Sequence, residues 1–505
     1  MAREHGGGQV LSILLDRSLG WRQVAEVAAG APLVLSDQAL ARIRAAHVLV
    51  ESIVAQGVRA YGVNTGVGAL CDVVIAGSKQ ADLSRNIVMS HAVGVGALLE
   101  PAAVRAIMAA AVNNFAHGVS GVRPAVVQGL LALLNGDCVP EVPAGGSVGY
   151  LTHMAHIALV LLGEGTVQSR GRRSSGADAL QSMGAAPLVL EAKEGLSLVN
   201  GTPCATGLSA IALSRTQRLL DWADCTAAMT FENLRGQIAA FDADGLSLRV
   251  SAGVSEVGRR LRGILSGSAI LLESAGLRTQ DPLSLRAVPQ VHGAVRDVFA
   301  HAARVVDDEL ASATDNPVVL GTADHPRAAS GANAVGAALG LTADSLGAAV
   351  AQLAAMSERR VDRLVNPLVS NLPAFLAADD GARSGFMIAQ YTAASLAADN
   401  RRLAAPASLD GGVTSGLQED HLSHATPGAL KLLKIIDNAQ LILAIELLAA
   451  AQAYELRRDS PARASQTDAI YRAVRAVIPH YADDRPLSGD IQAARDMIAR
   501  PPPVL

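Results

Sequence analysis

Long apolar segments with helical spacing dominate the second half of the chain. Alanine and leucine recur there every three to four residues, which is the period of a helix that buries a face. Several segments exceed the average helix of about 11–12 residues. The segments predicted to be helical are 206–240, 284–313, 331–365, 384–404 and 428–458. Because they are apolar on more than one face, they predict a central bundle of long helices.

Shorter helices are predicted in the first half. Ser36 opens a helical pattern that continues to Ile53, and Pro101 and Pro124 suit the first position of a helix. The stretch Val142–Gly165 is a Gly-rich turn that leads directly into an apolar helix. Unpaired N–H groups at a helix start can hold an anion or a reacting oxygen, so this turn is either a site or a plain helix start.

These patterns predict a mainly α fold, with a long-helix bundle and a smaller N-terminal mixed region. We expect an N-terminal domain with the active-site loops at 1–200, the central bundle at 201–458 and a C-terminal helical tail at 459–505. Within the first domain, residues 166–195 are polar and rich in Arg, Ser and Gly, which predicts an excursion over the surface.

Composition agrees with a helical protein and excludes some partners. Half of the residues are apolar but only 3% are aromatic, which disfavours a β-sandwich. The net charge of −4 with no basic block makes nucleic acid an unsuitable partner. The four cysteines show no metal-binding spacing, so we expect free thiols and no metal. The first residues lack a signal peptide, and no uncharged apolar run reaches about 18 residues, so we expect a cytoplasmic protein without a membrane span.

Polar loops, three of the five with a glycine, connect the long helices. Loops of this kind on a rigid scaffold are where binding and catalytic sites are usually built. The loops read L-V-N-G-T-P (198–203), Q-D-P-L-S-L-R (280–286), T-D-N-P (314–317), S-G-A-N (330–333) and T-S-G-L-Q-E-D-H (414–421).

Three further motifs precede these loops: Y-G-V-N-T-G-V-G at Tyr61–Gly68, S-H-A-V-G-V-G at Ser90–Gly96 and G-S-V-G at Gly146–Gly149. All of these motifs follow one another along the chain in the order found in a known enzyme family. Over about residues 55–425 the chain resembles the histidine ammonia-lyase family of aromatic amino acid lyases. The resemblance implies a helical fold of the fumarase/aspartase type. It also implies a homotetramer with active sites built from more than one subunit, and a small amino-acid substrate.

The chain departs from the family at the Gly-rich turn. Family members carry Ala-Ser-Gly after G-S-V-G, and this triad cyclises into an electrophilic methylidene-imidazolone group. Here Tyr150 follows Gly149 directly, as if three residues were deleted, so we expect no such group and no cofactor. Two further departures are Leu283, where the ammonia-lyases have Tyr, and Ala334, where they usually have Phe.

This loss bears on the expected reaction, because the electrophile activates a poor leaving group, the α-amino group. A trimethylammonium group leaves without such help. We therefore expect elimination of trimethylamine from a histidine betaine, ergothioneine or hercynine, as in the ergothionases, and disfavour ordinary histidine deamination. Two alternatives stay open: another lyase or cyclising enzyme acting on an aromatic substrate, and an inactive homologue that serves as a partner subunit.

The resemblance assigns roles to individual residues. Tyr61 matches the catalytic base, for which we expect a pKa lowered by a cation such as Arg286. Arg286 matches the arginine that binds the substrate carboxylate, and Asn200 matches the asparagine at the amino and carboxylate end. The substrate-binding positions comprise the imidazole-facing His91 and Glu419 and the polar pocket liners Gln280 and Asn333.

Tyr150 has no counterpart in the family's pattern. Standing where the electrophile would be, its ring either attracts a quaternary ammonium by a cation–π interaction or fills the space left by the deletion. The nearby His153 is expected to be structural.

Overall fold

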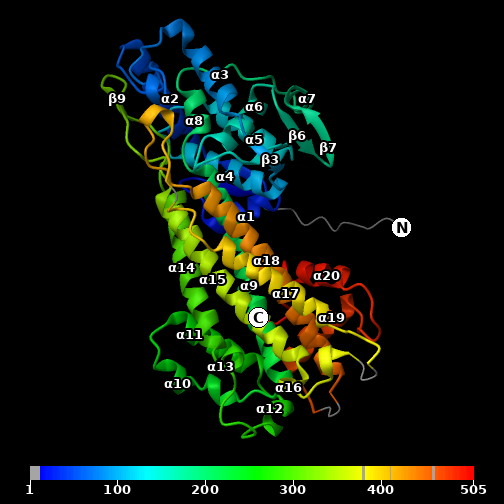
Figure 1. Ribbon diagram of the computed structural model, residues 1–505. Helices are drawn as coiled ribbons and strands as arrows, with labels where there is room; N and C mark the ends of the chain where they lie inside the picture. The colour runs from blue at the N-terminus through cyan, green and yellow to red at the C-terminus, as the bar shows by residue number, and fades with distance from the viewer. Residues whose placement is uncertain (1–11, 378–380, 410, 458–460, 505) are drawn as a thin grey trace. The chain divides into compact units, whose positions relative to one another are not determined.

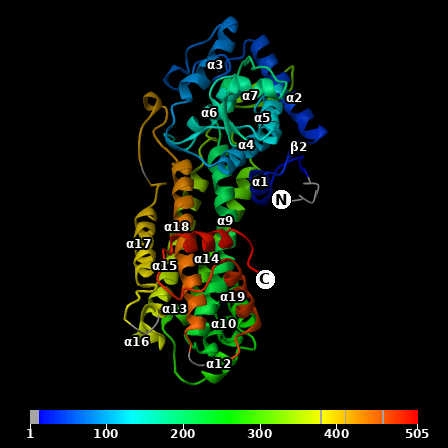
Figure 2. The same ribbon diagram turned by 90° about the vertical axis from the view of Figure 1, so that its right-hand side faces the viewer.

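The computed structural model describes residues 12–377, 381–409, 411–457 and 461–504. Its chain is mainly helical, as the sequence predicts, and its strands form small two- or three-stranded sheets (Figures 1 and 2). The chain forms two compact units. Unit 1 comprises Met1–Ala212, Ala303–Ala343 and Pro406–Leu430, and unit 2 comprises Leu213–Ala302, Asp344–Ala405 and Lys431–Leu505.

The long helices predicted from the apolar pattern are present, with ends shifted by up to seven residues. They are α9 (Pro203–Asn233), α14 (Val288–Leu310), α15 (Ala337–Val365), α17 (Met387–Leu403) and α18 (Ala425–Glu455). The segment predicted from residue 284 is interrupted, since the short α13 (Leu283–Arg286) precedes α14.

Local signals explain where the helices of unit 1 begin. Ser36 caps α2, because its hydroxyl accepts a hydrogen bond from the Ala39 N–H at 3.0 Å. Pro101 and Pro124 stand in the first turns of α4 and α5, where a missing N–H costs nothing. The helices are α1 (Trp21–Ala28), α2 (Asp37–Ala55), α3 (Gln80–His91), α4 (Pro101–Ala116), α5 (Pro124–Asn135), α6 (Thr152–Leu161), α7 (Gly176–Ser182) and α8 (Glu194–Val199).

Helix α4 is the centre of unit 1, since nearly all of its side chains are buried. Its backbone lies close to α9 at Gly207. A Cβ atom there would lie 2.6 Å from the backbone nitrogen of Ile107, so only glycine permits this approach. Small residues therefore let the two helices pack closely.

The strands of unit 1 lie between and beside these helices. β1 (Ile13–Leu15) pairs in parallel with β2 (Leu33–Leu35), and the other pairs are antiparallel. These are β3 (Val95–Leu98) with β5 (Pro143–Gly145), β4 (Val139–Pro140) with β6 (Thr166–Ser169), β6 with β7 (Arg172–Ser175), and β8 (Val318–Gly321) with β9 (Pro326–Ala329). The polar stretch expected as a surface excursion thus contains a hairpin and α7.

Unit 2 is held together by a buried carboxylate on α18. Glu446 accepts hydrogen bonds from Thr230 of α9 at 2.8 Å, from Ser357 of α15 at 2.6 Å and from Arg360 of α15 at 2.6 and 2.9 Å. Both charged groups are fully buried and form a bidentate ion pair, while Arg360 Nη1 has no hydrogen-bond partner among the described residues. Because removing one partner would strand the other charge, this network fixes the register of three helices.

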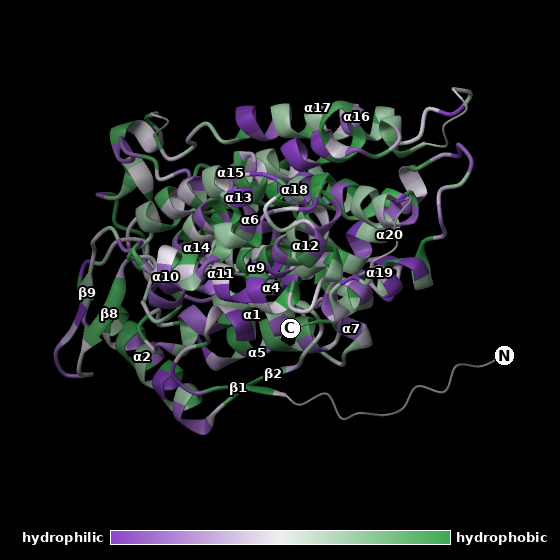
Figure 3. Ribbon diagram, turned by 90° about the horizontal axis from the view of Figure 1, so that it is seen from below, coloured by the Kyte–Doolittle hydropathy of each residue, from purple (hydrophilic) through white to green (hydrophobic). Residues whose placement is uncertain are grey.

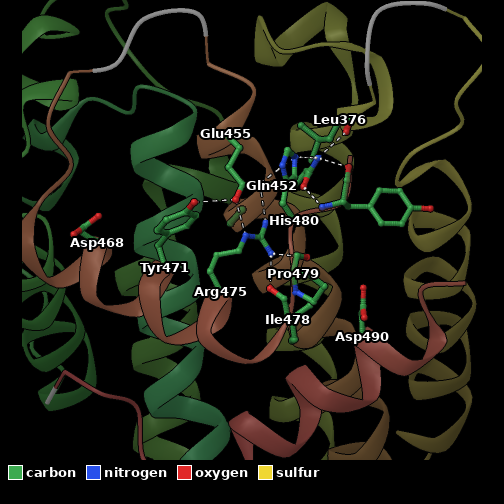
Figure 4. Close-up of polar contacts among 12 residues, drawn as sticks. Leu376, Gln452, Glu455, Asp468, Tyr471, Arg475, Ile478, Pro479, His480 and Asp490 are labelled. Carbon is green, nitrogen blue, oxygen red and sulfur yellow. Dashed lines mark hydrogen bonds and ion pairs between the residues drawn. The ribbon is translucent and has the colours of Figure 1, made fainter. Parts of the chain in front are cut away.

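Shorter helices complete unit 2. They are α10 (Ala243–Ser247), α11 (Ala252–Ile264), α12 (Ala269–Glu273), α16 (Pro367–Ser370), α19 (Ser465–Val477) and α20 (Ser488–Ile498). Glu455 at the end of α18 ties down α19, accepting from Tyr471 Oη at 2.8 Å and from Arg475 Nε at 2.6 Å (Figure 4). Gln452 donates to the backbone oxygen of Tyr481 at 2.9 Å and fixes the segment after α19.

Hydrophobic stretches alternate with hydrophilic residues along most helices (Figure 3). By length and composition alone, Glu194–Asn233 and Ala337–Val365 could cross a membrane. The apolar window of the first is entirely buried within the protein, and that of the second is 61% buried. We therefore assign both segments to the protein core, which passes the same test.

Candidate active site

The Gly-rich turn is held in one shape by hydrogen bonds. Ser147 Oγ donates to the Tyr150 carbonyl at 2.9 Å and accepts from the Gly149 N–H at 3.1 Å. Thr426, at the start of α18, donates to the Gly149 carbonyl at 2.8 Å. Leu151 has a φ of +76°, an unusual value for a branched residue, and it opens α6. The turn therefore presents the Tyr150 side chain in a fixed direction.

This turn borders a cavity of about 820 Å³ that is lined by residues of unit 1. Six other stretches contribute: the loop after Tyr61, the end of α3 at His91, the α8–α9 junction at Asn200, the position Asn316, and two later loops. The lining residues of the two later loops are Ser330, Gly331, Ala332, Ala334, Val335, Ser415, Gln418, Glu419, Asp420 and His421. Five of the residues singled out from the sequence thus meet in one cavity.

Glu419 is the charged group on which this cavity converges. Its backbone pairs with Thr414 in an antiparallel bridge, and Thr414 Oγ1 donates to Glu419 Oε2 at 3.0 Å. Tyr150 and Glu419 both line this cavity. Burial, then the negative charge of Glu419, raise the pKa of Tyr150 far above its usual value. The Tyr150 hydroxyl is therefore protonated near pH 7.

The Tyr61 hydroxyl is bonded to the backbone. It accepts a hydrogen bond from the Gly68 N–H at 3.1 Å, where the loop turns at a positive φ. Burial and the nearby Glu419 charge raise the pKa of Tyr61, although the Gly68 hydrogen bond opposes them. The expected lowering of this pKa is therefore not found, because the phenol is buried and the cavity brings a carboxylate, not a cation, near it.

Burial likewise lowers the pKa of His91, so its imidazole is neutral near pH 7. Its Nδ1 lies 3.1 Å from Ser90 Oγ. A neutral ring can serve as both donor and acceptor toward a bound ring.

Asn200 is fixed by its neighbours. Its Nδ2 donates to the Asn316 carbonyl at 2.6 Å, and its Oδ1 accepts from the Gly201 N–H at 3.0 Å. Behind it, the fully buried Lys193 and Asp315 form an ion pair at 2.9 Å. This pair anchors both the start of α8 and the T-D-N-P loop that carries Asn316.

Three predicted residues do not line the cavity. Arg286 and Gln280 belong to unit 2, where the Gln280 amide oxygen, once the amide is correctly oriented, accepts from Arg286 Nε and Nη1 at 3.0 Å. Asn333 is exposed, while its neighbours Ala332 and Ala334 line the cavity. Among the described lining residues there is no Lys or Arg, so this cavity alone offers no cation to a carboxylate.

His153 lies on α6 and is not among the described residues that line the cavity. Its Nε2 lies 2.9 Å from the Ala144 carbonyl, which can only accept, so this nitrogen carries the proton. Its Nδ1 is buried without a partner, and burial lowers the pKa of the ring.

Several lining residues went unnoticed in the sequence. Cys71 lies in the loop after Tyr61 and is partly exposed, whereas the other three cysteines are buried. Gln418 and His421 flank Glu419. Their only signal is their membership in the polar loop T-S-G-L-Q-E-D-H, which by itself does not say which side chains face inward.

The residues of the Gly-rich turn do not fit the electrophile that the resemblance implies. Tyr150, not Ala-Ser-Gly, follows Gly149. The chain's one Ala-Ser-Gly, at 329–331, lies instead at the end of β9, where Ser330 and Gly331 line the same cavity. Ala329 is paired with Val318 in the sheet, and the Gly331 N–H donates to Asn316 Oδ1 at 2.7 Å. Cyclisation needs that nitrogen to bend back onto the Ala329 carbonyl carbon, which this extended segment does not allow.

A metal site is a separate question. Within the described part of the chain, no three His, Cys, Asp or Glu side chains are grouped so as to hold a metal ion.

Histidine ammonia-lyases are similar to this chain over nearly its whole length. The enzyme of Symbiobacterium thermophilum is 42% identical over 475 residues, covering 93% of this chain and 92% of that protein. The enzyme of Myxococcus xanthus is 42% identical over 493 residues, covering 96% of each.

Solved structures of similar enzymes have a similar fold. Histidine ammonia-lyase from Trypanosoma cruzi has a TM-score of 0.89 at 35% identity, covering 97% of this chain and 93% of that one. Tyrosine aminomutase from Streptomyces globisporus has a TM-score of 0.92 at 33% identity, covering 97% of both. The ergothioneine-degrading ergothionase of Treponema denticola has a TM-score of 0.90 at 28% identity, covering 96% of this chain and 98% of that one.

These relatives overturn the expected trimethylamine elimination. The relatives at 42% identity are named histidine ammonia-lyases, whereas the ergothionase is a more distant neighbour at 28%. The prediction of a betaine substrate is therefore wrong, and so is the reason for disfavouring histidine deamination. Its physical error was to require a permanently charged leaving group, since a protonated α-amino group also departs as a neutral amine.

The family's sequence pattern matches residues 19–476, which is most of the chain. The helical fold and the polar loops that meet at the cavity agree with this match. The chain belongs to the aromatic amino acid lyase family, whose members are carbon–nitrogen lyases.

Proposed function

We propose that this protein is a histidine ammonia-lyase, which eliminates ammonia from L-histidine to give urocanate. The observation that carries the proposal is the convergence of Tyr61, His91, Asn200 and Glu419 on one cavity. The names of the relatives at 42% identity support the same substrate.

Each of these residues has a role in the proposed reaction. Glu419 and the neutral His91 hold the imidazole ring, the first as an acceptor and the second as donor or acceptor. Asn200 faces the amino and carboxylate end of the substrate. Tyr61, as its phenolate, takes a proton from the β-carbon, whose electron pair forms the double bond while the protonated amino group leaves as ammonia.

We propose further that the chain works without the methylidene-imidazolone group. The direct junction of Gly149 and Tyr150 supports this, and so do the engaged backbone groups of Ala329 and Gly331. All steps of the reaction then rest on the side chains named above.

We propose that the active protein is a cytoplasmic homotetramer in which another copy completes each site. The cavity has no Lys or Arg among its described lining residues. Arg286 lies in unit 2, where it is hydrogen-bonded to Gln280. In the resemblance, an arginine at this position binds the substrate carboxylate. A guanidinium arriving from another copy would also lower the raised pKa of Tyr61 and so favour the phenolate.

A direct assay tests the reaction. The purified protein is incubated with L-histidine while urocanate absorbance and free ammonia are followed together. We expect both products in equal amounts. Heat-inactivated protein serves as the control, and the absence of urocanate at high protein concentration would refute the proposed activity.

The proposed absence of the electrophile has a test independent of activity. The intact mass of the protein should equal the sum of its residues. A mass lower by two water molecules would show a cyclised triad, and peptide mapping around Ala329 would then locate it.

A further inference from the structure

The short helix α8 is tied at both of its ends to two consecutive residues of the T-D-N-P loop. At its start, Lys193 Nζ donates to Asp315 Oδ2 at 2.9 Å. At its end, Asn200 Nδ2 donates to the Asn316 carbonyl at 2.6 Å. Ser197, one turn after Lys193, donates to the same Asp315 oxygen at 2.8 Å. The helix and the loop therefore hold each other at three points.

The Asp315 carboxylate also fixes the residue that follows it. Its Oδ1 accepts from the Asn316 N–H at 2.7 Å, while Lys193 and Ser197 engage its Oδ2. The side chains of Lys193 and Asp315 are fully buried, so water does not compete for these contacts. Asn316 is thus held at its N–H, while its carbonyl accepts from Asn200.

The Asn200 amide is left with one donor and one acceptor for a ligand. An amide carries two N–H donors and two acceptor lone pairs. The Asn316 carbonyl, which can only accept, uses one N–H, and the Gly201 N–H, which can only donate, uses one lone pair. These two backbone groups fix the orientation of the amide. Because Asn200 lines the cavity, its remaining N–H suits a carboxylate and its remaining lone pair suits an ammonium.

We propose that Asp315 is a positioning residue: by holding the Asn316 N–H, it places the carbonyl that orients the Asn200 amide toward the substrate carboxylate. Lys193 compensates the buried charge. Stability alone does not explain this ion pair, since replacing a buried pair with apolar side chains is often neutral or stabilising. Apolar side chains would, however, offer no acceptor to the Asn316 N–H. The inference rests on the proposed function for the substrate, and on these hydrogen bonds for the positioning.

A double-mutant cycle tests the proposal by binding. Urocanate is titrated calorimetrically into the wild type, Lys193→Met/Asp315→Leu, Asn200→Ala and the triple variant. The first variant removes both buried charges together, so neither is left without its partner. Because a hydrogen bond to the ligand carboxylate is misaligned, we expect its Kd to rise about tenfold. In the Asn200→Ala background the same replacement should have almost no effect, since the amide to be oriented is gone.

A second charge-free pair keeps the acceptor. In Lys193→Met/Asp315→Asn, the substituted amide oxygen can still accept from the Asn316 N–H. Its nitrogen can donate to Ser197 Oγ, whose hydroxyl then donates to the Ser120 carbonyl, 3.2 Å away. Each polar group keeps a partner, so we expect a Kd for urocanate within about threefold of the wild type. Should Asp315→Leu prevent folding, which melting temperatures report, Asp315→Ala replaces it in the comparison.

Two controls separate positioning from a general disturbance. Imidazole has the ring of urocanate but no carboxylate, so its Kd should be the same in every variant. Lys431→Met/Asp344→Leu replaces another Lys–Asp ion pair, neither member of which is among the described lining residues, and should leave urocanate binding unchanged.

Several outcomes would overturn the proposal. Lys193→Met/Asp315→Leu might bind urocanate as tightly as the wild type, or lose equally with and without Asn200. Equal Kd values for the Leu and Asn pairs would show that the acceptor does not matter, and a wild type that binds no urocanate would refute the idea as well. If the wild type binds urocanate but never converts histidine, the proposed function fails while this cycle still decides the role of Asp315.

Discussion

Two tyrosines line the cavity near one carboxylate, and both have a raised pKa. They differ in one contact, since the Tyr61 hydroxyl accepts a hydrogen bond from the Gly68 N–H at 3.1 Å. This hydrogen bond favours the phenolate and partly offsets the effect of burial on the pKa of Tyr61. Residue type alone does not distinguish the two tyrosines, and this backbone hydrogen bond is what favours Tyr61 as the proposed base.

Replacing Tyr61 with Phe should therefore abolish most of the activity. Loss of a general base costs about 10²- to 10⁴-fold in kcat. Removing the hydroxyl eliminates only one hydrogen bond of a half-buried side chain, so the melting temperature should change little. Steady-state assays with histidine and thermal denaturation of the same sample check both points, and activity within threefold of the wild type would exclude Tyr61 as the base.

His153 predicts how stability depends on pH. Its pKa in the folded chain lies below the usual 6.5 because burial disfavours the charged ring. Below pH 6.5 the unfolded chain thus binds more protons than the folded one. The free energy of unfolding therefore decreases as the pH is lowered from 6.5 to the pKa of the folded chain. Above pH 6.5 this contribution is constant. The slope for one such histidine is at most about 1.4 kcal/mol per pH unit.

His153→Gln should flatten this slope, because the Gln amide can still donate to the Ala144 carbonyl but does not titrate. Urea denaturation at pH 5.5 and 7.5 measures the difference. Burial also lowers the pKa of His117 and His292, so part of the slope should remain. A slope unchanged by the substitution would contradict the assignment.

At the scale of elements, the start of α18 supports the Gly-rich turn. Thr426 is fully buried and its hydroxyl donates to the Gly149 carbonyl. The backbone at Gly149 has a φ of +149°, and a Cβ there would lie 2.5 Å from Ser423 Oγ. The turn before Tyr150 therefore depends on a glycine and on a helix that begins 275 residues later.

Thr426→Val should loosen this turn. It leaves the Gly149 carbonyl without its donor, so we expect a destabilisation of about 1–3 kcal/mol and a loss of activity. Thr392→Val is the control, since that exposed threonine only bonds to its own helix at Ile388. The control should change the free energy of unfolding by less than about 0.5 kcal/mol. Equal effects of the two variants would remove the special role of Thr426.

The elements themselves were largely predictable, because apolar periodicity and helix caps are local. Ser36 and Pro101 marked helix starts correctly, and the ends of the long helices lie within seven residues of the predicted ones. The motif resemblance predicted site roles for Tyr61, His91, Asn200 and Glu419, and all four line one cavity. What could not be predicted was that Tyr150 shares this cavity with Glu419, which depends on how two distant loops are anchored. The predicted direction of the Tyr61 pKa shift was wrong for the same reason.

At the scale of the whole molecule, Arg286 is the test of assembly. If each site combines Tyr61 from one copy with Arg286 from another, the variants Tyr61→Phe and Arg286→Gln should each be inactive but complement each other. Random mixing of equal amounts should restore about a quarter of the wild-type sites. Co-expression followed by activity assay and size-exclusion chromatography checks this. No recovery in a mixed tetramer would place both residues of a site in one copy.

The loop after Tyr61 carries a thiol with a practical consequence. Cys71 lines the cavity and is partly exposed, while Cys138, Cys204 and Cys225 are buried. A maleimide dye should therefore attach at a single position in the folded protein without any prior cysteine removal. Ligand entering the cavity would slow the labelling, so the native chain carries its own reporter of occupancy, readable even in a variant that no longer turns over.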